Sequence, residues 1–232
     1  MNAGAGSARG VGIALLGILV AGYPFLVAAG LDHLSARAIG AALLAAALAG
    51  ALVAGGGASR VLSLLLRRFG VLMLLGGAAA ATDNPAALML LPSLTSVWLL
   101  GTFASSLRRE PSIVAQFASA AHNGSFPDFL LPYCRKVTWM WCAFFAINAV
   151  VGGLLALAAP ARLWAFYTGF LAYVMIALLA TAEYVLHKSR FRFYEDGWDD
   201  RLWRRWCPPE QTALGRRTLA WQRARSTRNH PA

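Results

Sequence analysis

Two residues near the middle of the chain, His122 and Asp128, have the types needed to activate a hydroxyl for acyl transfer. A histidine held by an aspartate can take the proton of an acceptor hydroxyl, and the motif that does this at membranes has four residues between the two. Here five residues intervene, and Pro127 stands where the aspartate is needed. The spacing argues against a catalytic pair, and we expect a solvated or helix-capping loop.

A second pair, Glu183 and His187, lies four residues apart and therefore on one face of a helix. Such a pair can bind a metal ion or pass a proton, but two ligands do not complete a metal site. The alternative is that Glu183 forms an ion pair with Lys188, His187 or Arg190. We therefore expect no metal and no cofactor, and His122, Asp128, Glu183 and His187 remain weak catalytic candidates.

Four cations bracket the segment from Leu107 to Trp141, which is the longest break in an otherwise apolar sequence: Arg108, Arg109, Arg135 and Lys136. Exposed charges of this kind raise the encounter rate with an acidic protein partner. The alternative is that they fix the membrane topology and contact lipid phosphates. We predict that these four residues bind a partner.

Within this segment, residues 107–136 are predicted to form a cytoplasmic loop that contains a helix over 111–123. Pro111 suits the first turn of a helix, and Ile113, Val114 and Phe117 recur at helical spacing. An amphipathic helix beside membrane spans favours a position at the membrane surface, with its apolar side toward lipid.

The composition indicates a membrane protein. Hydrophobic residues make up 58% of the 232 residues, charged residues make up 13%, and the mean hydropathy is +0.55. One soluble core of ordinary proportions cannot bury so much apolar surface. We therefore predict an all-α, polytopic helical bundle over residues 1–186, with about six spans and one interfacial helix.

The predicted spans are apolar segments close to the roughly 20 residues that a bilayer requires. Their bounds are Val11–Gly30, Ala38–Val53, Phe69–Ala81, Ala86–Ser106, Val137–Ala159 and Leu163–Leu186. Arg67 and Arg68 would be costly at mid-depth, which places Val61–Leu66 along the interface. The first segment resembles a signal peptide, but it lacks a clean end and is expected to remain as a span.

The distribution of Lys and Arg predicts the orientation. With six spans and a cytoplasmic N-terminus, 19 of the 21 basic residues lie inside, and only Arg37 and Arg162 lie outside. Cytoplasmic loops carry this excess of positive charge. Both termini are predicted to be cytoplasmic, in a bacterial inner membrane.

Residues 187–232 form a basic tail that holds 11 of the 21 Lys and Arg residues, interleaved with aromatic residues. Because the tail begins directly at the end of a span, we expect it to bind acidic membrane lipids and not nucleic acid. We expect part of the tail to be disordered. The three cysteines form no CxxC motif, so no disulfide framework is predicted.

Several segments between Pro92 and Arg192 together resemble a bacterial family. They are REPSIVAQFA, YCRKVTWMWCAFFAINA, WAFYTGFLAYV and EYVLHKSRFRF, and they are similar to uncharacterised inner-membrane proteins of aryl polyene (xanthomonadin-type) pigment clusters. The resemblance implies a setting in which acyl carrier proteins and other enzymes build a fatty-acid-like polyene. It carries no catalytic residue.

Three functions are compatible with these patterns. The first is a docking or accessory protein that brings pigment-building enzymes, with an acyl carrier protein as the leading partner, to the inner leaflet. The second is a membrane acyl or glycosyl transferase that acts on the lipid product. The third is a subunit of a lipid or pigment transporter, which the absence of internal repeats disfavours. The absence of a catalytic motif favours the first.

Overall fold

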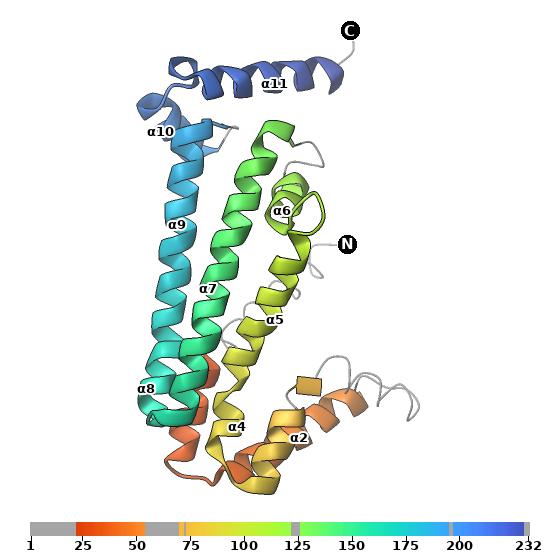
Figure 1. Cartoon of the computed structure of the whole chain (residues 1–232), viewed down its shortest axis with the longest axis vertical. Coiled ribbons are helices and arrows are strands. Elements are labelled where there is room, and N and C mark those ends of the chain that lie inside the picture. Colours follow the sequence, from red (N-terminus) through yellow and green to blue (C-terminus); the bar gives the residue numbers. More distant parts are fainter. Residues whose placement is uncertain (1–21, 54–69, 72, 122–125, 195–196, 230–232) are drawn as a thin grey trace, which may run out of the picture. The chain divides into compact units, whose positions relative to one another are not determined.

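The computed structural model describes residues 22–53, 70–71, 73–121, 126–194 and 197–229, and its ordered elements are all helices (Figure 1). No strand occurs in these residues. The prediction of an all-α fold is therefore confirmed for the described part of the chain.

Three helical segments are long and apolar enough to cross a membrane: Pro85–Ser106, Asp128–Ala158 and Ala161–Phe191. The first contains α4 (Pro85–Met89) and α5 (Leu91–Ser106), and the second contains η1 (Asp128–Leu130) and α7 (Leu131–Ala158). The third contains α8 (Ala161–Phe166), η2 (Tyr167–Leu171) and α9 (Ala172–Phe191). They correspond to the last three predicted spans, and they indicate a membrane protein.

The count of six spans is not supported by the described residues. The predicted second span is helical, as α2 (Ala36–Val53), and its apolar stretch within the described residues is Ala36–Gly50. Shorter apolar helices also lie in the described parts of the first and third predicted spans, at Gly22–Leu31 and Met73–Thr82. Residues 11–21 of the first predicted span, and Arg67 and Arg68 beside the third, lie outside the described residues.

The chain divides into two compact units, and the first comprises Met1–Thr102 and Cys142–Tyr173. Its core consists mainly of small and aliphatic side chains: Val27, Ala28, Ala36, Ala79, Leu88, Met89, Ala156, Trp164 and Ala165. A Cβ added at Gly40 would lie 2.5 Å from the Gly76 carbonyl oxygen and 2.8 Å from the Ala80 nitrogen. Two helix backbones therefore touch directly, as small residues permit in membranes.

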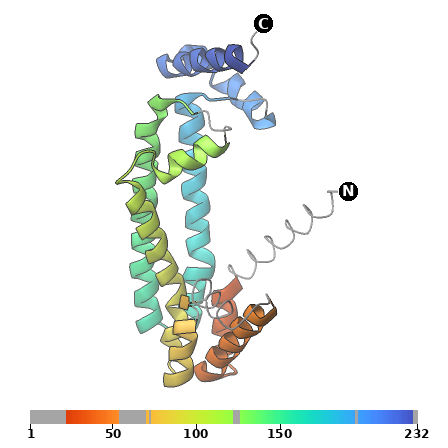
Figure 2. The same cartoon turned by 90° about the vertical axis from the view of Figure 1, so that its right-hand side faces the viewer.

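The second unit comprises Phe103–Trp141 and Val174–Ala232. It contains the end of α5, η1, the beginning of α7 and almost all of α9. Four further elements belong to it: α6 (Ile113–Ala121), α10 (Trp198–Trp206), η3 (Pro209–Gln211) and α11 (Ala213–Asn229). Figure 2 shows α10 beside the end of α9, with α11 beyond it, in agreement with Figure 1.

Two sequence predictions concern this unit. A helix lies where 111–123 was predicted, although α6 is shorter and Asn123 is outside the described residues; its place at a membrane interface stays a prediction. Residues 198–206 and 213–229 of the tail are helical, and the expected disorder of part of the tail stays a prediction. The break between these helices falls at Cys207, Pro208 and Pro209, since proline cannot continue a helix.

Candidate functional site

The second unit contains every described residue that the sequence marked as a candidate: Arg108, Arg109, Asp128, Arg135, Lys136, Glu183 and His187. His122 lies outside the described residues, so the structure does not bear on a pair with Asp128. Asp128 is exposed at the first position of η1, and no side-chain hydrogen bond caps this helix.

The loop that carries Arg108 and Arg109 is fixed at both ends. The Ser106 Oγ accepts a hydrogen bond from the Ile113 backbone N–H at 3.1 Å, which ties the end of α5 to the start of α6. Leu107 and Ala115 are buried beside these positions. Because the loop is held in this way, the exposed Arg108 and Arg109 side chains project from a defined backbone.

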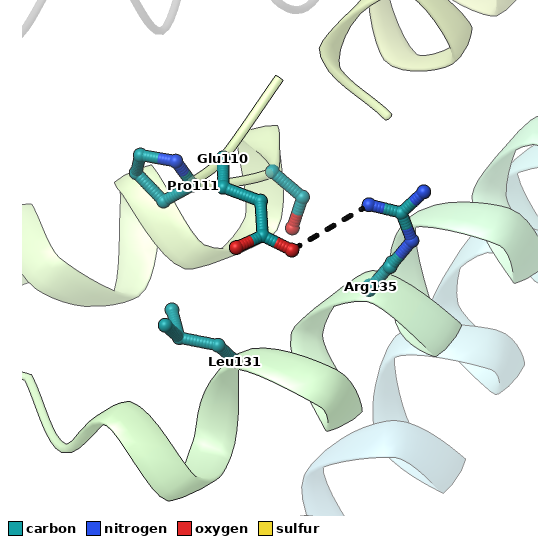
Figure 3. Close-up of a pocket in the computed structure, with 5 residues that line it drawn as sticks. Glu110, Pro111, Leu131 and Arg135 are labelled. Carbon is teal, nitrogen blue, oxygen red and sulfur yellow. Dashed lines mark ion pairs between the residues drawn. The ribbon is translucent and has the colours of Figure 1, made fainter. Parts of the chain in front are cut away.

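Glu110 and Arg135 form an ion pair across the loop, with 3.8 Å between Oε1 and a guanidinium nitrogen (Figure 3). The two side chains are 75% and 45% exposed, so the pair contributes at most about 1 kcal/mol. The cavity lined by Glu110, Pro111, Ser112, Leu131 and Arg135 measures about 10 Å³, enough for one water molecule. Part of the Arg135 charge is thus balanced within the chain, and the site is no ligand pocket.

The predicted Glu183 and His187 pair has a third member that the sequence did not reveal. The Tyr133 hydroxyl of α7 donates a hydrogen bond to Glu183 Oε1 at 3.2 Å. The Tyr133 ring lies 6.0 Å from the His187 ring and 4.7 Å from the Phe191 ring. A carboxylate, a phenol and an imidazole therefore meet near one end of two spanning helices, and such groups can transfer protons.

The described residues contain no group of three or more His, Cys, Asp or Glu side chains that could hold a metal ion. The alternative interpretation proposed that Lys188 pairs with Glu183. The structure shows other partners for Lys188. Lys188 binds Asp200 and lies 3.8 Å from Asp199, so its charge is used to attach α10 to α9.

This attachment, which we call the α10 clamp, consists of Tyr184, Lys188, Asp199, Asp200 and Trp203. The Tyr184 hydroxyl donates to Asp199 Oδ2 at 2.6 Å, and this hydrogen bond lowers the pKa of Asp199 below its ordinary value. The Tyr184 ring meets the Trp203 ring edge to face, with 6.3 Å between the centroids. No pattern in the sequence indicated the clamp beyond the spacing of opposite charges.

Helix α11 packs on the end of α9 through backbone acceptors. The buried Thr218 hydroxyl donates to the Phe191 carbonyl at 2.9 Å, and the Gln222 amide donates to the Tyr194 carbonyl at 2.8 Å. Burial raises the pKa of Tyr194 to about 12. The second half of the tail is therefore a folded part of the unit.

A cation–π contact joins α11 to the loop. The Arg217 guanidinium lies 4.7 Å from the centroid of the Phe129 ring in η1. Such a contact contributes about 0.5–1 kcal/mol at an exposed site. The tail and the loop with its cations thus belong to one surface.

An open cavity of about 280 Å³ lies between α10, η3 and α11. Its lining combines polar and apolar side chains: Tyr194, Arg204, Pro208, Pro209, Glu210, Leu219 and Gln222. The volume is close to the lower limit of about 300 Å³ for small-molecule sites.

The second unit also carries most of the charge, with 15 Lys and Arg against 8 Asp and Glu. This arrangement suits the binding of anions or acidic surfaces more than covalent chemistry. Comparison of the chain with protein-family models, curated proteins and solved structures finds no match.

Proposed function

We propose that this protein docks an acidic partner protein at the cytoplasmic face of a bacterial inner membrane. The observation that carries the proposal is the set of exposed cations Arg108, Arg109 and Lys136 on segments held by the Ser106 and Glu110 contacts. A charged surface on an ordered backbone keeps its pattern, so an approaching partner meets complementary charge with little ordering cost.

The partner that we propose is an acyl carrier protein. Such carriers are strongly acidic, and the resemblance to aryl polyene proteins supplies a setting that requires one. Docking would bring the carrier and its growing polyene chain to the inner leaflet, where an apolar product can partition into lipid. The protein would then act as an accessory component of pigment biosynthesis.

The proposal includes six spans and cytoplasmic termini. The support is the excess of Lys and Arg on one side of the predicted topology, 19 against 2. The first three spans rest on sequence alone. Fusions at Ala232 test the orientation: a fluorescent protein should be bright and a periplasmic phosphatase inactive, whereas an active phosphatase would refute the topology.

The docking role is tested with the protein in lipid nanodiscs and a purified acyl carrier protein from the same organism. Replacing Arg108 and Arg109 by Gln removes two charges from the loop. At about 1 kcal/mol for each charge pair, the Kd should rise by about tenfold or more at low salt, and the difference should shrink as salt increases.

The matched control is the double variant Arg37→Gln and Arg162→Gln, which removes the same charge from exposed positions of the first unit. It should bind the carrier as the unchanged protein does. Equal binding by the unchanged protein and both double variants would refute docking at the loop. An equal loss of binding in both variants would show that only the net charge of the protein matters, which would also refute docking at the loop.

A second candidate function, a membrane acyl or glycosyl transferase, is supported by the hydrogen bond between Tyr133 and Glu183 beside His187. In that function Glu183 or His187 would act as the general base for an acceptor hydroxyl. Glu183→Gln preserves the shape of the side chain but removes the base. If cells with this variant accumulated an unmodified lipid precursor while the carrier still bound, the transferase would replace docking as the main role.

A further inference from the structure

Helix α10 lies back along the last turns of α9. The α10 clamp joins Asp199 and Trp203 to Tyr184, which is seven residues before the end of α9 at Phe191. At 1.5 Å per residue, the attachment point lies about 10 Å short of the helix end. The spanning segment that ends at Phe191 has 31 residues, or about 46 Å, which exceeds a hydrocarbon core of about 30 Å. The clamp therefore lies near head-group depth.

The two sides of α10 face different surroundings. Arg204 lines the cavity with Leu219 and Gln222 of α11, so this side of α10 faces α11. Leu202 and Trp206 are each two residues from Arg204, and at 3.6 residues per turn they lie about 160° around the helix from it. Their side chains are 51% and 71% exposed. The apolar side of α10 thus points away from α11.

That direction is toward the body of the spanning helix, because α11 is bonded to its end at Phe191. At the level of the clamp, α9 exposes the apolar side chain of Val185 next to Tyr184 and that of Leu186 on the opposite side of the helix. In the membrane these two side chains contact lipid, because no other helix among the described residues covers them and lipid is what surrounds the exposed surface of a spanning helix. Leu202 and Trp206 expose apolar side chains on α10, which the clamp holds beside this part of α9.

Charge complementarity identifies the lipid. Arg201 and Arg205 are exposed on α10. Arg205 lies three residues after Leu202 and therefore on the same side of the helix, and Arg201 directly precedes Leu202, so that a guanidinium can reach phosphate while Leu202 stays in the apolar layer. Tryptophan is enriched at this depth of a bilayer. A short helix with this pattern fits an anionic membrane surface, where each basic residue contributes about 1 kcal/mol.

We propose that α10 is an interfacial anchor, which inserts Leu202 and Trp206 among the head groups around α9 and binds anionic phospholipids through Arg201 and Arg205. The anchor goes beyond the docking function and needs no protein partner. It holds the folded tail at a fixed height, so that α11 faces the aqueous side.

The test places an environment-sensitive NBD fluorophore at Leu202→Cys in the full-length protein in nanodiscs. Cys134 and Cys142 are buried, so Cys207→Ser removes the accessible native thiol. The matched control carries the fluorophore at Ala220→Cys, an exposed position of α11. Nanodiscs contain either phosphatidylcholine alone or equal parts of phosphatidylcholine and phosphatidylglycerol, with or without a lipid that carries a doxyl quencher near the head group.

The proposal expects a blue-shifted NBD emission at position 202 and loss of that emission with the doxyl lipid, both larger with phosphatidylglycerol. Position 220 should keep a solvent-like emission in every nanodisc. Replacing Arg201 and Arg205 by Gln should remove the dependence on phosphatidylglycerol, whereas Arg216→Gln on α11 should not. Solvent-like emission at position 202, or protection that appears only when a protein partner is added, would overturn the proposal.

Discussion

The two units of this protein are built by different means. The first unit has 6 Lys and Arg and 2 Asp and Glu, and its described core is held by the close approach of small and aliphatic residues. The second unit has 15 Lys and Arg and 8 Asp and Glu. It is held by hydrogen bonds, ion pairs and aromatic contacts. Packing of small residues leaves few groups for recognition, whereas the polar contacts of the second unit fix a charged surface.

The strongest test of this contrast is Lys188→Met. The Asp200 side chain is 7% exposed and would lose the cation that it binds. Breaking a buried pair by removing one partner costs about 3 kcal/mol, so α10 should separate from α9. Trypsin should then cut at Arg201, which the unchanged protein should resist. The exposed Lys136→Met serves as control and should leave the cleavage pattern unchanged.

The first unit should respond to size instead of charge. Gly40→Ala places a methyl group 2.5 Å from a backbone oxygen, and relieving this overlap should destabilise the unit by about 1–3 kcal/mol. Gly77 has no atom within 4 Å of its Cβ position, so Gly77→Ala should be neutral or slightly stabilising. Thermal unfolding in detergent compares the two variants. Equal melting temperatures would show that the two helices do not touch.

A smaller effect is expected for Thr218→Val, which keeps the shape of a fully buried side chain and removes its hydroxyl. The Phe191 carbonyl would lose its side-chain donor, at a cost of about 1–2 kcal/mol. Amide hydrogen exchange in α11 should become faster while exchange in the first unit stays the same. The control Ala220→Val adds a valine at an exposed position of α11 without removing a hydroxyl, and matching exchange rates in the two variants would contradict the role of the hydroxyl.

The pH dependence should be the weakest effect. The pKa of Asp199 lies below its ordinary value of 3.8 in the folded protein, so its contribution is present above that pH and is lost as the pH falls through the folded pKa. The pKa of Tyr194 is raised from 10.0 to about 12, so its contribution is present below pH 10 and is lost as the pH rises toward 12.

Titration of Asp199 and Tyr194 should therefore leave the near-ultraviolet circular dichroism signal constant between about pH 4 and pH 10. Tyr184→Phe removes the hydrogen bond that lowers the pKa of Asp199, so the acid transition should begin at a higher pH. An unchanged acid transition in this variant would separate Asp199 from the attachment of α10.

The sequence predicted the last three spans well, because long apolar segments with few charges are a strong signal. Pro85–Ser106 and Ala161–Phe191 differ from the predicted Ala86–Ser106 and Leu163–Leu186 mainly at their polar ends. The Ala- and Gly-rich segment of α2 is helical as predicted, and its crossing of the membrane stays part of the proposed topology.

The site was harder to predict, since its partners are distant in the sequence. Tyr133 meets Glu183 across 50 residues, and Thr218 meets Phe191 across 27. The tail has the composition of a disordered or lipid-bound segment, yet Thr218 and Gln222 attach it to the end of α9. Only folding brings these donors to their backbone acceptors, and a linear pattern of arginine and tryptophan does not reveal it.

The most direct test of the central claim, that the second unit is the recognition surface, is hydrogen–deuterium exchange of the protein in nanodiscs with and without the acyl carrier protein. Slower exchange on binding is predicted for residues 107–112 and 135–136 at the loop, and for α11, with no change in the first unit. Protection in the first unit, for example in α2, or no protection anywhere at saturating carrier, would contradict the account.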